Sequence, residues 1–70
     1  MSAIEPGSRV LTRDVLGDML ERRAISGVEI QNDHPIVWVC KEQEWLDAES
    51  EGREPEGFPW PAEDVSPATY

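Results

Sequence analysis

The clearest hydrophobic pattern lies in the middle of the chain, where residues 35–40 run Pro-Ile-Val-Trp-Val-Cys without a polar residue. β-branched and aromatic residues favour a strand, and a continuous apolar run of this length is typical of a strand buried on both faces. Residues 28–30 (Val-Glu-Ile) alternate apolar with polar, and the polar cluster Gln-Asn-Asp at 31–33 favours a turn. The pattern therefore predicts a β-hairpin around residues 31–33.

The segment 13–24 fits two structures. As a helix, it would gather five apolar residues on one stripe, namely Val15, Leu16, Met19, Leu20 and Ala24. As strands, it would turn at Gly17-Asp18 and return over residues 21–30. Gly17 would cost a helix interior about 1 kcal/mol relative to alanine, and residues 22–30 continue naturally into the hairpin. We therefore favour the strand and keep the helix at 13–24 as the alternative.

The C-terminal half begins with a predicted short helix over residues 41–50, which Gly52 can end. A polar loop follows at 51–57. The segment 58–61 (Phe-Pro-Trp-Pro) cannot be a helix interior or a central strand, because its two prolines fix φ and lack an N–H donor. Residues 62–65 are expected to form a last short strand. The prediction is a single small domain spanning 1–70, with flexible ends at 1–7 and 66–70.

Two segments give the chain a resemblance to a known fold. Pro6-Gly7-Ser8-Arg9-Val10 leads through a turn into the first strand, and Pro61-Ala62-Glu63-Asp64-Val65 is similar to the element that commonly ends small SH3-like barrels. The resemblance implies a mainly β protein, an SH3-like barrel of about five strands, with the helix near 41–50 as a departure. The alternative is an α+β fold with a helix at 13–24.

Length and cysteine content limit how such a domain can be stabilised. A chain of 70 residues buries only about 60% of the surface that its unfolded form exposes. Cys40 is the only cysteine and His34 the only histidine, which excludes an internal disulfide and disfavours a structural zinc site. We expect no cofactor. Three features favour a cytoplasmic protein without a membrane segment: no apolar run approaches 18 residues, the start has no basic region and no apolar core, and the single thiol is unpaired.

Charge separates the two halves of the chain. Of the net −9, residues 1–40 hold six acids and four bases, a net of −2, and residues 41–70 hold nine acids and two bases, a net of −7. Such a field repels phosphates, so direct nucleic-acid binding is not expected. It attracts a protein partner with a basic surface, or a basic site that otherwise holds nucleic acid. The composition, with Arg preferred over Lys, is similar to small bacterial or phage proteins.

Candidate catalytic groups are sparse, and we expect no enzyme. His34 lies beside Pro35 in a turn without an evident partner, and Cys40 ends the buried strand, far from the electropositive setting that a reactive thiol needs. The carboxylates lack the spacing of a calcium loop. A cation site or small enzyme remains the third and weakest hypothesis.

Aromatic residues and acids supply the candidate binding surface. Trp38 is expected in the core, and Trp60 is expected either to fold over Trp38 and close the barrel or to stay exposed with Phe58 as an interface anchor. The candidate partner-binding residues are Trp45, Phe58, Trp60, Glu42, Glu49, Glu54 and Glu56. Two functions follow: a protein–protein interaction module or small accessory protein, and an acidic decoy that mimics nucleic acid. The sequence leaves the oligomeric state open.

Overall fold

The computed structural model describes residues 4–68; residues 1–3 and 69–70, which belong to the predicted flexible ends, lie outside the described part. The elements in chain order are β1 (Arg9–Arg13), β2 (Met19–Gln31), β3 (His34–Cys40), α1 (Glu42–Glu51), β4 (Phe58–Pro61), the 3-10 helix η1 (Ala62–Asp64) and β5 (Val65–Pro67).

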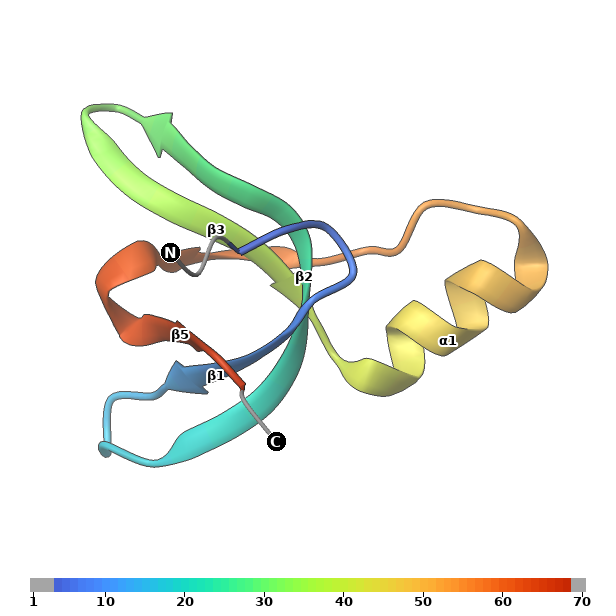
Figure 1. The fold of residues 1–70 in the computed structure, drawn as a ribbon, viewed down its shortest axis with the longest axis horizontal. Helices are drawn as coiled ribbons and strands as arrows, with labels where there is room; N and C mark the ends of the chain where they lie inside the picture. The colour runs from blue at the N-terminus through green and yellow to red at the C-terminus, as the bar shows by residue number, and fades with distance from the viewer. Residues whose placement is uncertain (1–3, 69–70) are drawn as a thin grey trace.

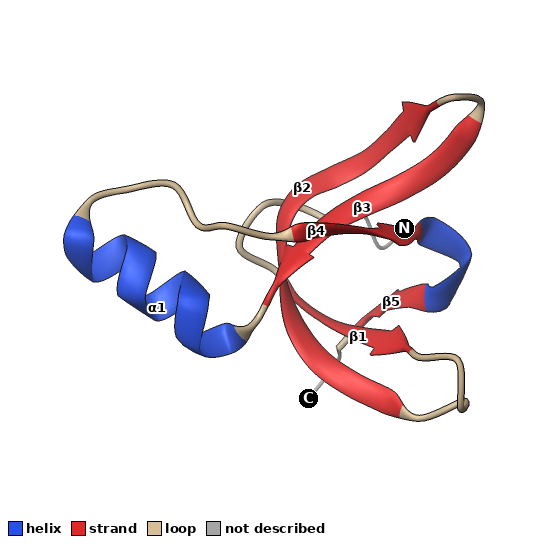
Figure 2. Ribbon diagram, turned by 180° about the vertical axis from the view of Figure 1, so that it is seen from behind, coloured by secondary structure: helices blue, strands red, loops and turns tan. Residues whose placement is uncertain are grey.

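The five strands form one antiparallel sheet in the order β4-β3-β2-β1-β5 (Figure 1). The predicted mainly β class with one α-helix is confirmed, and segment 13–24 is turn and strand, so the alternative helix is wrong. The sheet is not closed into a barrel. Its two outer strands, β4 and β5, are joined through η1 and do not pair with each other (Figure 2).

Side-chain and backbone chemistry explains why residues 14–18 turn. The carboxylate oxygen Oδ1 of Asp14 accepts hydrogen bonds from the backbone N–H groups of Leu16 and Asp18, both at 2.9 Å. Gly17 adopts a φ of 86°, which glycine tolerates and a helix interior does not. Val15 and Leu16 therefore lie in solvent at the tip of the β1–β2 hairpin, where no helical stripe can form.

The long strand β2 belongs to both halves of the sheet. Its first part pairs with β1, from Arg13 opposite Met19 to Arg9 opposite Arg23. Its second part pairs with β3, and the register shifts between Ala24 and Val28. Such an irregularity bends a strand and increases its twist. The predicted β2–β3 hairpin is confirmed.

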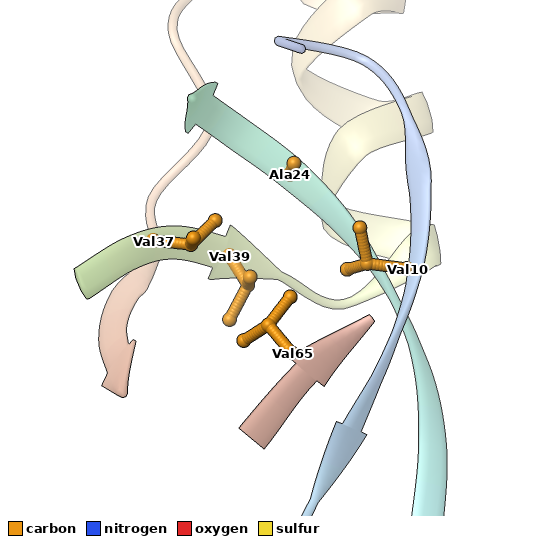
Figure 3. Close-up of a cluster of buried hydrophobic side chains, with 5 residues drawn as sticks. All are labelled: Val10, Ala24, Val37, Val39 and Val65. Carbon is orange, nitrogen blue, oxygen red and sulfur yellow. The ribbon is translucent and has the colours of Figure 1, made fainter. Parts of the chain in front are cut away.

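The hydrophobic core is small and consists mainly of valines. Its buried members are Val10, Ala24, Val37, Val39 and Val65 (Figure 3). Four partly buried apolar residues pack against this cluster, namely Ile4, Phe58, Trp60 and Ala62. No residue of α1 belongs to this cluster, and Ala48 is the one buried residue of the helix.

Two expectations about β3 need correction. Burial alternates along it, with Val37 and Val39 fully buried and Trp38 only half-buried, so the strand is not buried on both faces. Trp60 lies opposite Val37 and Trp38 lies opposite Pro59. Successive side chains point to opposite faces of a sheet. Trp60 therefore packs on the core face and does not fold over Trp38, which lies on the other face.

The helix and the C-terminal segment largely follow prediction. α1 ends at Gly52, whose φ of 69° gives the left-handed cap, and the Gly52 N–H donates to the carbonyl of Ala48. The expected last strand is displaced: residues 62–64 form η1 and β5 begins at Val65. β5 extends through Pro67, which lies opposite Val10, into the segment expected to be a flexible end. No helix in residues 4–68 has the length and apolarity needed to cross a bilayer.

Candidate functional site

The predicted binding residues fall into two separate groups. Trp45, Glu42 and Glu49 lie on α1, and Glu54 and Glu56 lie on the loop that follows it. We call residues 42–57 the acidic arm, which projects from the sheet (Figure 1). The remaining two, Phe58 and Trp60, lie on β4. The structure thus does not unite all the predicted aromatics in one face.

Glu42 attaches the acidic arm to the sheet. Its carboxylate accepts hydrogen bonds from Nε and Nη2 of Arg23, at 2.6 and 3.0 Å, and lies 3.8 Å from Nη2 of Arg9. The hydrogen bond with Arg23 lowers the pKa of Glu42 and raises that of Arg23. Nη1 of Arg23 also donates to the carbonyl of Gly7, at 2.8 Å. Glu42 is therefore engaged within the chain.

Trp45 occupies the inner side of the acidic arm and is half-buried. The guanidinium carbon of Arg23 lies 6.0 Å from its ring centroid, within reach of a cation–π interaction. Gly7 lies so close that an added Cβ would come within 3.3 Å of Cζ2 of the ring. The exposed side of the ring faces a hollow of about 180 Å³. Its lining residues are Trp45, Ala48, Glu49, Arg53 and Pro55.

Arg53 folds the loop back onto the helix. It pairs with Glu44 at 2.5 Å and with Glu51 at 3.1 Å. Glu44 also accepts the backbone N–H of Glu56, at 3.0 Å. The hydrogen bonds lower the pKa of Glu44 and raise the pKa of Arg53. This network sets the course of the loop around the Trp45 hollow.

Three exposed acids of the arm form no ion pair with any described residue: Glu49, Glu54 and Glu56. Glu49 stands in the last turn of α1, which contains no basic residue. The C-terminal end of a helix carries partial negative charge, so an acid there is unfavourable and a cation favourable. The arm therefore presents acids that form no ion pair with a described residue beside an aromatic ring.

The side chains of Phe58 and Trp60 pack against the hydrophobic core. Their rings meet edge to face, with centroids 5.8 Å apart and an interplanar angle of 62°. Nε1 of Trp60 donates to the carbonyl of Arg13 at 3.1 Å and so links β4 to the end of β1. Both rings pack against the valine cluster. Of the two alternatives for the aromatic-proline segment, packing against the core describes the structure.

The structure exposes apolar residues that the sequence analysis did not select. Val28 and Ile30 on β2 are 55% and 70% exposed, and Val15 and Leu16 lie in solvent at the other hairpin tip. The available signal was the alternation of residues 28–30, which places both apolar side chains on one face of the strand. Because β3 was expected to be covered on both faces, the sequence did not indicate that Val28 and Ile30 stay exposed.

The two candidate reactive residues, His34 and Cys40, lie at opposite ends of β3. His34 is exposed at the start of β3, and Cys40 is fully buried. Burial, reinforced by Glu44 and Glu42, raises the pKa of the Cys40 thiol, which disfavours the reactive thiolate. Within residues 4–68 no three His, Cys, Asp or Glu side chains are grouped to hold a metal ion.

The chain matches no protein-family model, and no curated protein or solved structure is significantly similar to it.

Proposed function

We propose that the protein is a non-catalytic interaction module that binds a protein partner with a basic surface through the acidic arm. The observation that carries this proposal is the setting of Glu49: an unpaired acid at the negative end of α1, lining the Trp45 hollow. A Lys or Arg side chain of a partner can lie against the ring and pair with this carboxylate at once.

The small contribution of the arm to the core supports the same conclusion. Ala48 is the only buried residue of α1, and no α1 residue enters the valine cluster. Glu49 lies at the negative end of α1 without an ion pair, which is unfavourable in the isolated protein. A bound cation offsets that cost.

A charge-matched comparison tests the proposal. The triple variant Glu49→Gln/Glu54→Gln/Glu56→Gln removes the three exposed acids of the arm that form no ion pair with a described residue. The control Asp18→Asn/Glu21→Gln/Glu63→Gln removes the same charge from exposed acids elsewhere. Affinity capture from the native host lysate, with each partner identified by mass spectrometry, should retain the partner on the wild type and the control and lose it on the arm variant. Equal capture by both variants would overturn the proposal.

The second candidate, an acidic decoy of nucleic acid, rests on the same charge, since no base stands within α1. It requires that the captured partner bind DNA or RNA and that a short duplex displace the arm. A decoy complex is driven mainly by charge, so it should weaken steeply as salt rises. Retention of the partner in the presence of excess duplex, with a shallow salt response, favours the interaction module.

The proposal extends to the fold family and the cellular location of the protein. The SH3-like resemblance is supported by the Pro6-Gly7 turn into β1 and by five antiparallel strands, and it departs in the open sheet and in α1. A buried, unpaired Cys40 is consistent with the reducing cytoplasm of a bacterial cell or a phage-infected host. The acidic field supports the absence of direct nucleic-acid binding.

A further inference from the structure

Among the described residues, no strand pairs with one edge of the outer half of β2. β1 pairs with β2 only from Met19 to Arg23, whereas β3 continues to pair with it as far as Gln31. Within residues 4–68, no strand lies on the side of residues 28–31 that faces away from β3. We call residues 28–31 on this side the β2 edge.

The hairpin geometry determines which backbone groups this edge offers. Asn32 and Asp33, with φ of 51° and 66°, form a two-residue turn, so Gln31 and His34 beside it are the first hydrogen-bonded pair. Bonded and non-bonded pairs alternate along an antiparallel ladder. Val28 and Ile30 therefore direct their N–H and C=O groups away from β3, to the free edge.

A contact on β3 agrees with this alternation. The backbone N–H of Trp38 donates to Oγ of Ser26, at 3.3 Å, so the backbone polar groups of Trp38 face β2. The backbone polar groups of the adjacent residue, Val37, then face β4. Val37 is the cross-strand partner of Val28. Because the backbone groups of Val37 face β4, the two residues do not exchange hydrogen bonds, and the backbone N–H and C=O of Val28 face away from β3.

The other edges of the sheet are protected. By the same alternation, Pro59 and Pro61 on β4 and Pro67 on β5 occupy the outward positions, and proline has no N–H to offer. On the inner part of β2, the backbone of Glu21, a charged residue, faces the side away from β1. The β2 edge has no proline and no base, and native edges without such protection are templates for a further strand.

The side chains of the β2 edge fit an apolar neighbour. Val28 lies opposite Val37, so Val28 and Ile30 extend the apolar face of the core beyond its covered part. They remain 55% and 70% exposed. An added strand would bury them beside Ile4, whose carbonyl lies next to Gly27 at the end of this edge.

Charge selects the partner. Glu29 lies between Val28 and Ile30 on the opposite face, Asp33 follows in the turn, and neither forms an ion pair with a described residue. We propose that the β2 edge binds an extended segment of a partner protein in which apolar residues alternate with Lys or Arg. This segment adds as a sixth strand, with apolar side chains on Val28 and Ile30 and its cations facing Glu29 and Asp33. The net charge of −9 opposes a second copy of the chain as the occupant.

A synthetic peptide tests the proposal on the intact protein. The probe is a blocked eight-residue peptide in which valine alternates with lysine. Its binding should slow amide hydrogen exchange at Val28 and Ile30 and leave Gln31, already bonded within the hairpin, unchanged. The same peptide with N-methyl groups on the amides of one edge keeps its charge and side chains but should bind about tenfold more weakly, because backbone hydrogen bonds are lost.

Two variants and a charge-reversed peptide complete the test. Ile30→Pro removes an outward N–H without touching a β2–β3 hydrogen bond and should weaken binding about tenfold, whereas Ile30→Val should bind as the wild type does. A peptide with glutamate in place of lysine should not bind. Equal binding of the N-methylated and parent peptides would overturn strand addition, and this result does not depend on whether the proline variant folds. A concentration-dependent dimer that Ile30→Pro abolishes would assign the edge to a second copy and also overturn the proposal.

This surface is separate from the acidic arm. The Gln variants at Glu49, Glu54 and Glu56 should bind the valine-lysine peptide with at most the small loss that reduced net charge causes. Failure of the peptide test therefore leaves the function of the arm intact, and failure of the capture test leaves the β2 edge intact.

Discussion

The guanidinium of Arg23 and the carboxylate of Glu42 form a two-pronged ion pair, at 2.6 and 3.0 Å, that joins β2 to the first turn of α1. Arg23 lies on the face of β2 opposite the buried Ala24, and its side chain is 18% exposed. The pair is thus better shielded than an ordinary surface ion pair. It is the principal polar link between the core-bearing sheet and a helix that contributes one buried residue.

Glu42→Gln should lower the free energy of unfolding by about 1 kcal/mol, because a paired, part-buried carboxylate is replaced by a neutral amide and Arg23 loses its partner. Urea denaturation followed by tryptophan fluorescence measures the change. Glu49→Gln is the matched control on the same helix. It removes an acid from the C-terminal turn and should raise the stability by a few tenths of a kcal/mol. An unchanged free energy of unfolding in Glu42→Gln would show that the Arg23–Glu42 ion pair does not stabilise the attachment of the acidic arm to the sheet.

The contribution of Glu42 should depend on pH. Its folded-state pKa is held below its ordinary value by Arg23, so its stabilising contribution is complete above the unfolded-state pKa of about 4.5 and is lost as pH falls through the folded value. The stability difference between the wild type and Glu42→Gln should therefore be constant from pH 8 to about pH 6 and shrink below about pH 5. The other acids are protonated in both proteins, so their effect on stability cancels in the difference between the wild type and Glu42→Gln. A difference that grows with acidity would contradict the assignment.

Gly57 meets the sheet where no side chain fits. A Cβ at this position would collide with the backbone carbonyl of Val39 and with Cδ1 of Ile25. Gly57→Ala should destabilise the protein by about 2–3 kcal/mol, because the rigid backbone of β3 cannot move away. Thermal unfolding measures it.

Gly52→Ala provides the comparison for Gly57. No atom lies within 4 Å of an added Cβ at Gly52, but its φ of 69° strains an L-residue. This variant should cost about 1 kcal/mol. If Gly52→Ala destabilised the protein more than Gly57→Ala, backbone conformation, and not space, would determine which substitutions this loop accepts.

Local signals predicted the elements of this fold well. The turn cluster at 31–33, the β-branched run before Cys40 and Gly52 after the helix each specify a structure within a few residues, and all three are found where they were expected. The segment 13–24 favours strand but keeps a helix as the alternative, because its apolar residues suit a helical stripe as well as a strand. Asp14, which caps the turn through two backbone hydrogen bonds, settles the question in the structure.

Long-range pairing was beyond prediction. The sequence contains nothing that places Trp60 opposite Val37 and Trp38 opposite Pro59, and that register decides which tryptophan faces the core. The alternation of residues 28–30 is plain in the sequence, but it does not show that β1 stops pairing with β2 at Arg23. Among the candidate site residues, charge density pointed to the acidic arm, but it could not separate Glu42, paired with Arg23, from Glu49, which is unpaired.

Cys40 should be unreactive while the protein is folded. Its side chain is fully buried, and burial together with Glu44 and Glu42 raises its thiol pKa, so both access and thiolate formation are suppressed. Labelling with a chromogenic disulfide reagent at pH 8 should therefore follow the opening of the structure and accelerate sharply across the urea transition.

A cysteine introduced at Val15 tests whether burial causes this protection. Val15 is 101% exposed in the β1–β2 turn, so the thiol of Val15→Cys should react within the mixing time of an ordinary assay, while Cys40 in the same molecule reacts at the opening rate. The destabilising Gly57→Ala exchange should speed the labelling of Cys40 but not of residue 15, because only the buried thiol needs the sheet to open. Equal rates at both positions in native conditions would show that α1 leaves the end of β3 open to reagents.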